Sequence, residues 1–265
     1  MSGGLLAMLA MGEFMLALLT LGLALVSWRD DRRHVAISVR LGLQFVAAVA
    51  WVGCFELSAW SAVAVVSLVW MANLYNFMDG SDGMAGGMAV FGFGAYSAAA
   101  WLGGDVSLSL LAAAIAAASL GFLRFNFPPA RLFMGDVGSV PLGFAAGALG
   151  YQGWMLALWP WWFPLLVFSP FIMDATATLL CRSLRGERVS QAHREHYYQR
   201  LVRMGWGHRR TALAEYGLML LVALSALAIA RMPGDAQLVS LLCWAGIYAV
   251  LARRIDRAWQ AAGQQ

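Results

Sequence analysis

The sequence predicts an all-α fold, a polytopic bundle of about nine transmembrane helices that forms one membrane domain over residues 1–265. Of the 265 residues, 61% are hydrophobic and only 12% are charged, whereas a soluble domain carries about 25% charged residues. The apolar residues gather in runs close to the length of about 20 that a helix needs to cross a bilayer. The basic residues are confined almost entirely to alternate connections between these runs.

Polar clusters divide the chain into nine predicted spans. Bilayer hydrocarbon satisfies no backbone groups, so each span must be helical. The first span has no basic leader and no clean cleavage site, which favours a true span over a signal peptide. The sixth and ninth spans are short, and the seventh begins with Trp159, Trp161 and Trp162, which we expect to form an interfacial belt. The spans cover residues 5–26, 36–54, 57–75, 84–102, 106–123, 140–154, 159–181, 211–230 and 237–252.

The basic residues predict the orientation of the chain. All 18 are arginine, and the absence of lysine excludes a lysine base, a lysine Schiff base and a lysine-containing phosphate loop. With nine spans, every arginine except Arg231 falls on one side, eight of them in a basic loop at residues 182–210. Short loops rich in basic residues stay in the cytoplasm. We therefore expect an inner-membrane protein with a cytoplasmic C-terminus, whose net charge of +4 reflects membrane sorting and not nucleic-acid binding.

Five aspartates lie in or beside loops on this same predicted side: Asp30, Asp31, Asp79, Asp82 and Asp136. Carboxylates at the edge of the hydrocarbon are costly and are functional candidates by default. A divalent cation would relieve their mutual repulsion. Ligand sets made of oxygen alone favour Mg²⁺ or Mn²⁺ over Zn²⁺. The sequence therefore predicts a magnesium or manganese site at the cytoplasmic face.

Two glycine-rich loops and the basic loop carry groups suited to phosphate. Glycines between Asn73 and Gly87 let the backbone approach a ligand, and Asp136 lies between glycines at the head of the sixth span, where free N–H groups favour an anion. Arginines of the basic loop suit bidentate phosphate contacts, and contact with lipid headgroups is an equally good interpretation of that loop alone. Together the three stretches indicate transfer of a phosphorylated group from a soluble donor to a lipid acceptor.

Asp174 lies inside the seventh span, about 10 Å from its cytoplasmic end at 1.5 Å per residue. Burial at that depth demands a partner, and we expect an arginine or a polar backbone group. This predicts a structural role more than a catalytic one. The three cysteines lie far apart in apolar surroundings, so we expect buried hydrophobic residues and neither a disulfide nor a zinc site.

Four strings of residues resemble the polyprenyl-phosphate N-acetylhexosamine-1-phosphate transferase family, which is glycosyltransferase family 4. They occur in the family's order and run from residue 30 to about residue 201: the DD pair at Asp30, NLYNFMDGSDGMAGG from Asn73, FNFPPARLFMGDVGS from Phe125 and AHREHYYQRL from Ala192. The second and fourth strings look most like the branch that initiates O-antigen synthesis. The resemblance implies Mg²⁺-dependent transfer of a sugar-1-phosphate from a UDP-N-acetylhexosamine to undecaprenyl phosphate, which releases UMP.

The resemblance also implies which residues act. In the family, the DD pair lies near the acceptor phosphate, and an aspartate and an amide share the metal. The catalytic set carried over is Asp30, Asp31, Asp79, Asp136 and His193, with Asn76 and Asp136 on the metal. A base role for the DD pair and a purely orienting role both stay open, because a phosphate monoester, with a second pKa of about 6, is already mostly ionised near neutral pH.

The substrate-binding set carried over comes from three of the four strings. One aspartate matches a nucleoside contact and one aromatic matches a platform for uracil. A histidine and an arginine of the basic loop match groups that hold the donor's diphosphate or sugar. In the order of the chain the set is Asn73, Asp82, Phe133, Arg194 and His196.

One feature of the family has no counterpart in this sequence. Members usually carry two more helices and a glycine-rich loop ahead of the span that leads to the DD pair, and this sequence begins at that span. A catalytically inactive, truncated homologue therefore stays as an alternative, together with a membrane transporter, which would place its charges near the bilayer midplane. The sequence leaves open which hexosamine is used and whether the protein forms a homodimer.

Overall fold

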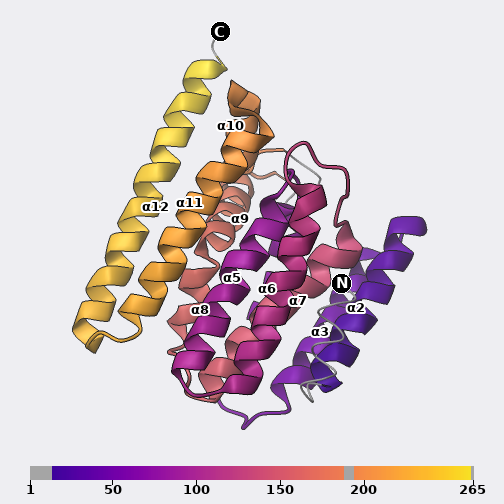
Figure 1. The fold of residues 1–265 in the computed structure, drawn as a ribbon. Helices are drawn as coiled ribbons and strands as arrows, with labels where there is room; N and C mark the ends of the chain where they lie inside the picture. The colour runs from indigo at the N-terminus through magenta and orange to yellow at the C-terminus, as the bar shows by residue number, and fades with distance from the viewer. Residues whose placement is uncertain (1–13, 188–193, 264–265) are drawn as a thin grey trace.

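The computed structural model describes residues 14–187 and 194–263, and within these ranges every regular element is a helix (Figure 1). The predicted all-α, multi-pass membrane fold is confirmed. The helices are α2 (Phe14–Arg32), α3 (Ile37–Val52), α4 (Ser61–Met78), α5 (Met84–Leu102), α6 (Val106–Asn126), α7 (Asp136–Met155), α8 (Trp162–Val167), α9 (Ser169–Leu184), α10 (Tyr197–Leu201), the π-helical turn η1 (Val202–Trp206), α11 (Gly207–Ile229) and α12 (Gly234–Ala262).

Within the described residues each predicted span coincides with helix, but the helices do not end where the spans end. Helix α12 runs on to Ala262 instead of residue 252, because polar side chains end an apolar stretch without ending the hydrogen bonding of a helix. The seventh predicted span is two helices, α8 and α9, which meet at Phe168. Pro170 follows at the start of α9 and has no N–H to continue the ladder from α8.

Five segments of the described chain are long and apolar enough to cross a membrane by length and composition. They are α4, α5, α6, the continuous stretch Tyr197–Ile229 and α12, and α3 is a shorter apolar helix. Two of the smaller predictions are wrong. The cysteines are exposed on the surface of the bundle, which faces lipid and so tolerates apolar groups. Trp159 and Trp162 are buried, leaving Trp161 exposed, since their indole N–H groups bond Gly150 and Gln237.

Helix α7 is packed against α2 and α4, and α5 is packed against α6 and α11. The contact between α7 and α4 depends on glycine, because a Cβ at Gly143 would stand 2.5 Å from the carbonyl oxygen of Met71. Buried Tyr75 of α4 donates a hydrogen bond to the carbonyl of Ala85 in α5 at 2.7 Å. Helix α12 lies at the edge of the bundle in Figure 1, and Tyr248 is the single residue of α12 that is buried.

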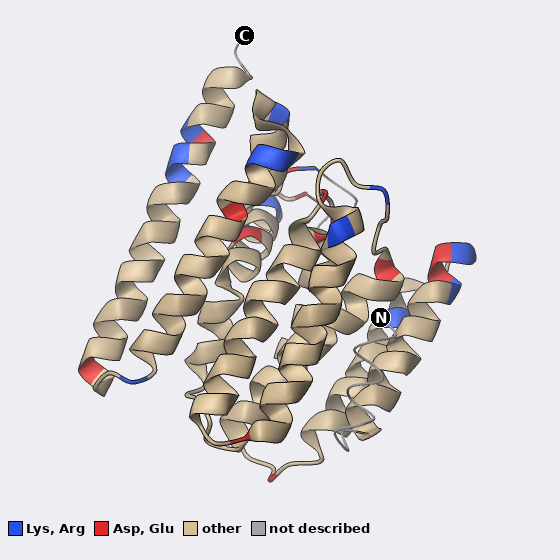
Figure 2. Ribbon diagram, viewed as in Figure 1, with Lys and Arg blue, Asp and Glu red and all other residues tan. Residues whose placement is uncertain are grey.

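Most charged residues, acidic as well as basic, gather at one end of the bundle (Figure 2). We call one end the basic end: there α2, α4, α6 and α9 finish, α3, α5, α7 and α11 begin, and most of the arginines gather. Arg231 lies in the α11–α12 connection at the opposite end. The loops that carry the four motif strings all meet at the basic end, so the helix order alone brings remote polar segments together.

Candidate active site

Helix termini bring three of the predicted aspartates together at the basic end. Asp30 and Asp31 lie in the last turn of α2, and Asp136 is the first residue of α7. Arg40, near the start of α3, joins them: its Nη1 pairs with Asp30 and lies 3.3 Å from Oδ2 of Asp136. The other oxygen of Asp30 accepts a hydrogen bond from the N–H of Val35 at 2.8 Å. One guanidinium therefore holds acids from two distant parts of the chain.

The end of α4 completes this acidic group. Oδ1 of Asn76 accepts a hydrogen bond from the hydroxyl of Ser139 in α7 at 2.7 Å, and the Asn76 side chain also bonds the Asp136 carboxylate. Asp79 directly follows the last residue of α4. Burial raises the pKa of its carboxyl to about 7, and the nearby Asp136 carboxylate adds to the rise. Near neutral pH, Asp79 is therefore balanced between its neutral and its ionised forms.

Two carboxylates of the acidic group, Asp31 and Asp79, accept no hydrogen bond from any residue that the structure describes. Oδ2 of Asp31 lies against Gly135, 3.4 Å from the place where a Cβ would stand. Gly135 precedes α7 and has a φ of +63°, so a side chain there would be strained as well as crowded. The entrance to α7 is thus lined by carboxylate oxygens that the protein itself leaves available.

The donor atoms of the acidic group can be compared with the ligands that the expected magnesium ion requires. Among the described residues, no three His, Cys, Asp or Glu side chains are grouped so that they could hold a metal ion. The oxygen donors that fit are Asp136 and Asn76. Magnesium usually takes one or two carboxylates and completes its shell with water and substrate phosphates. The residues present therefore fit an ion that arrives with a phosphate better than one held in a closed protein cage.

A second polar cluster ties the α4–α5 loop to the α6–α7 loop. Oδ2 of Asp82 accepts a hydrogen bond from the N–H of Ala130 at 3.0 Å, and Oδ1 of Asn126 accepts one from the N–H of Gly83 at 2.9 Å. The other Asp82 oxygen lies 3.9 Å from Nδ1 of His208, at the start of α11. Asp82 therefore sets the register of two loops and turns its remaining oxygen toward a histidine.

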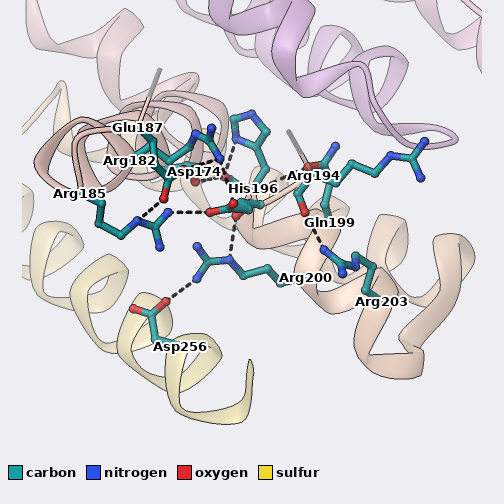
Figure 3. A network of polar contacts seen from close by, with 12 residues as sticks. Asp174, Arg182, Arg185, Glu187, Arg194, His196, Gln199, Arg200, Arg203 and Asp256 are labelled. Atoms are coloured by element: carbon teal, nitrogen blue, oxygen red, sulfur yellow. Dashed lines mark hydrogen bonds and ion pairs between the residues drawn. The ribbon is translucent and has the colours of Figure 1, made fainter. Parts of the chain in front are cut away.

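Acids of the protein itself neutralise three arginines of the basic loop (Figure 3). These ion pairs are 2.6–2.9 Å long and join Arg182 and Arg185 to Glu187 and Glu195, and Arg200 to Asp256 of α12. Arg194 differs from them: it is exposed, and no carboxylate among the described residues pairs with it. Of these four arginines, Arg194 is the one whose charge remains available to an outside phosphate.

His196 and Asn73 bind the protein itself. His196 is 3% exposed, and its Nδ1 lies 3.1 Å from Oδ1 of Asp174. The amide nitrogen of Asn73 donates to Oε1 of Gln44 in α3 at 2.6 Å and to a carbonyl of its own helix. Asn73 thus points toward α3, one turn of helix away from Asn76.

Two further predicted residues remain. Phe133 is 72% exposed and lies at the rim of an apolar cavity of about 490 Å³ between α2, α6 and α7. His193 lies outside the described residues. The nine other predicted site residues all lie at the basic end, and the acidic group contains Asp30, Asp31, Asn76, Asp79 and Asp136.

Some residues of the site carry no motif signal. Arg40 is predicted only as a marker of membrane sidedness, yet it joins Asp30 to Asp136. Its place at the head of the helix after the DD pair is the signal that could have identified it. Ser139 and His208 reach the site through side-chain contacts across the bundle, which no spacing along the chain encodes. Asp174 was predicted to have an arginine or backbone partner, and its partners are two backbone N–H groups, a hydroxyl and a histidine.

The fold and the site together define a multi-pass helical membrane protein with a carboxylate, amide and arginine site at one edge of its bundle. Residues 14–153, just over half of the chain, match the family model described as Glycosyl transferase family 4. The chain belongs to this family, as the resemblance of its motifs predicts. The matched region contains the whole acidic group and the second polar cluster up to α7.

Proteins of similar sequence whose names state an activity support the same assignment. The chain is 32% identical over 197 residues to the probable undecaprenyl-phosphate N-acetylglucosaminyl 1-phosphate transferase of Bacillus subtilis, covering 73% of this chain and 55% of that protein. It is 33% identical over 180 residues to the phospho-N-acetylmuramoyl-pentapeptide-transferase of Levilactobacillus brevis, covering 66% and 53%. The same-named protein of Geobacillus thermodenitrificans is 28% identical over 249 residues, covering 82% and 74%. The chain spans about half the length of the first two relatives.

Proposed function

We propose that this protein transfers a sugar-1-phosphate from a UDP-N-acetylhexosamine to undecaprenyl phosphate. The observation that carries the proposal is the acidic group at the end of an apolar bundle. Two helix ends and one helix start bring together Asp30, Asp31, Asn76, Asp79 and Asp136, and Arg40 pairs with Asp30 and Asp136. One relative of this chain is named as a probable undecaprenyl-phosphate N-acetylglucosaminyl 1-phosphate transferase. A soluble phosphate donor and a membrane acceptor can meet only at such an edge.

The reaction joins two anions. An oxygen of the acceptor phosphate attacks the β-phosphorus of the UDP-sugar, the bond from that phosphorus to the bridging oxygen breaks, and UMP leaves. Charge neutralisation and positioning therefore supply most of the catalysis. A bound Mg²⁺ or Mn²⁺, held by Asp136 and Asn76, would neutralise diphosphate charge. Arg40 keeps Asp30 and Asp136 at a fixed separation, and Arg194 offers an unpaired guanidinium to the donor.

The acceptor's isoprenoid needs an apolar path beside this site. A cavity of about 460 Å³ lies between α4, α7 and α8, and its walls are almost wholly apolar. Its residue nearest the site along α4 is Met71, eight residues before Asp79 and so about 12 Å away. We assign this cavity to the lipid chain. Ser67, on the same wall, gives a position from which the cavity can be filled.

The motif forms and the arginines support a finer identity, which we propose here. The second and fourth strings favour an enzyme that starts a lipid-linked O-antigen or related surface polysaccharide. We propose that the basic end faces the cytoplasm at the inner membrane, where UDP-sugars are available, because short loops rich in arginine stay in the cytoplasm. A homodimer stays an open alternative.

Membranes that contain the full chain, incubated with undecaprenyl phosphate and radiolabelled UDP-GlcNAc or related UDP-sugars, test the proposal. We expect label in the lipid phase that depends on Mg²⁺ or Mn²⁺ and disappears in Asp136→Ala. Asp105→Asn is the matched control, because Asp105 only caps α6 at the opposite end. If no donor labels lipid while the protein is folded, the transferase assignment is wrong, and a transporter or inactive homologue takes its place.

A further inference from the structure

We propose that Asp174 is a positioning residue: from inside the bundle it fixes the segment 194–198 against the end of α4, and so sets the distance between the donor-binding loop and the acidic group. This inference rests on the proposed function for its catalytic consequence. Its structural part, the anchoring of the loop, can be measured without turnover. The motif strings do not contain Asp174, which lies 22 residues before His196.

Asp174 is 8% exposed and accepts four hydrogen bonds, and Figure 3 shows it beside His196. Its Oδ1 receives the N–H of Tyr197 at 2.9 Å, the hydroxyl of Thr178 at 3.2 Å and Nδ1 of His196 at 3.1 Å. Its Oδ2 receives the N–H of Tyr198 at 3.0 Å. The two backbone N–H groups and the hydroxyl can only donate to this carboxylate, and the His196 ring nitrogen completes the set. Three of the four donors belong to the loop segment.

The depth of Asp174 in the bundle makes its hydrogen bonds important for stability. Asp174 precedes the end of α9 at Leu184 by ten residues, about 15 Å of helix. A buried carboxylate without partners is strongly destabilising, and its hydrogen bonds are correspondingly strong. The loop segment therefore supplies most of the donors that this buried carboxylate requires. The segment is held from below by a group that cannot move outward with it.

The anchored segment in turn contacts the end of α4. The Tyr198 hydroxyl, which belongs to a fully buried side chain, donates to the carbonyl of Phe77 at 3.3 Å. Gly80 leaves room for this contact, since a Cβ there would stand 3.0 Å from the side-chain nitrogen of Gln199 and closer still to the Tyr198 hydroxyl. Phe77 and Gly80 flank Asp79. The bonds at Asp174 thus continue through Tyr198 to a residue next to the acidic group.

Asp256 of α12 contacts Tyr197 of the segment and Arg200, two residues beyond it, and provides a comparison. It pairs with Arg200 at 2.6 Å and accepts a weaker bond from the Tyr197 hydroxyl at 3.4 Å. Its side chain is 41% exposed, whereas that of its partner Arg200 is 9% exposed, so the ion pair is partly open to water, which weakens it. Two carboxylates therefore hold one loop, and burial identifies Asp174 as the one that determines its position.

The test measures kcat and KM for both substrates in Asp174→Ala and Asp174→Asn of the full chain. We expect kcat/KM for the UDP-sugar to fall about 100-fold in the alanine variant, the size expected for a displacement of about 1 Å, and less in the asparagine variant, which keeps one acceptor oxygen. The KM for undecaprenyl phosphate should stay within about threefold, because Asp30 and Asp31 do not touch the loop. Asp256→Asn should lose less than about threefold.

Two further variants separate positioning from folding. Ser169→Ala removes a buried hydroxyl contact of the same helix, to Tyr248 at 2.6 Å, without touching the loop, and should leave both KM values unchanged. Tyr198→Phe keeps Asp174 intact but removes the bond to Phe77, and should reproduce a smaller, donor-specific loss. Equal losses for donor and acceptor, or a donor parameter unchanged in folded Asp174→Ala, would overturn the positioning role.

Hydrogen exchange distinguishes a failed anchor from a failed function. In the wild type, the amides of Tyr197 and Tyr198 should exchange slowly, and they should exchange at least about tenfold faster in Asp174→Ala but not in Ser169→Ala. An inert wild type with this pattern would refute the transferase assignment and retain the anchor. Equal exchange in wild type and Asp174→Ala would refute the anchor whatever the activity.

Discussion

Asp79 should make the stability of the protein fall as pH rises. Burial, helped by the charge of Asp136, raises the pKa of Asp79 from 3.8 to about 7 in the folded chain. Between these values the unfolded chain has released the proton and the folded chain retains it. The stability that the neutral form contributes is therefore fully present below about pH 4 and is lost as pH approaches about 7. Asp79→Asn keeps the shape of the neutral acid at every pH.

The size of the effect follows from the same values. Each pKa unit corresponds to about 1.4 kcal/mol, so the rise from 3.8 to about 7 corresponds to about 4 kcal/mol at most. For a domain of 150–250 residues, 1 kcal/mol moves the unfolding midpoint by about 2–4 °C. Above about pH 7.5, Asp79→Asn should therefore unfold about 8 °C higher than the wild type, and near pH 4 the two should coincide.

Thermal unfolding of the purified chain in detergent, followed by tryptophan fluorescence with EDTA from about pH 4 to about pH 8.5, measures this difference. Asp105→Asn, at the opposite end of the bundle, should follow the wild type. Added Mg²⁺ should restore the wild-type midpoint at high pH, because a cation stabilises the ionised acidic group, and should do less for Asp79→Asn. Parallel curves for wild type and Asp79→Asn over the whole range would refute the reasoning.

Three other substitutions test separate features. Arg40→Gln leaves Asp30 and Asp136 without their shared cation and should lower kcat by about 100-fold while the fold persists, which lipid labelling measures. Gly143→Ala should destabilise the fold by about 1–3 kcal/mol because its Cβ meets α4, whereas Gly94→Ala, which meets nothing within 4 Å, should be neutral or slightly stabilising in the same thermal assay. Ser67→Trp, which fills the cavity beside α4, should raise the KM for undecaprenyl phosphate several-fold and leave that for the UDP-sugar unchanged.

The arrangement of spans could be predicted from the sequence because polar clusters mark where hydrocarbon ends. The ends of helices could not, since a helix such as α12 continues in water to Ala262 once it has left the apolar layer. The break at Phe168 is similar: the run from Trp159 is uniformly apolar, and the proline that interrupts it removes a hydrogen bond without changing hydropathy. Hydropathy indicates whether a segment lies in lipid or in water, whereas backbone hydrogen bonding decides where its helix begins and ends.

The loops of the site could be predicted because their residue types are unusual beside apolar spans, but the partners within them could not. His196 is predicted to face the donor, and its Nδ1 bonds Asp174, a residue of another helix. Arg182, Arg185 and Arg200 look alike in sequence to Arg194, yet only packing reveals that nearby acids neutralise them. Charged residues can be counted in a sequence, but only the fold decides which of them remain available to a ligand.

The aspartates of the basic end fall into two groups, according to whether another residue donates a hydrogen bond to them. Asp82 and Asp174 bond backbone N–H groups of loops distant in sequence, so their oxygens determine where those loops lie. Asp31 and Asp79 have no donor among the described residues, and the protein bears the electrostatic cost in the raised pKa of Asp79. A fold selected for stability alone would pair or replace such groups. The proposed function accounts for them, because a cation and a phosphate would complete the group beside Asp136 when substrate binds.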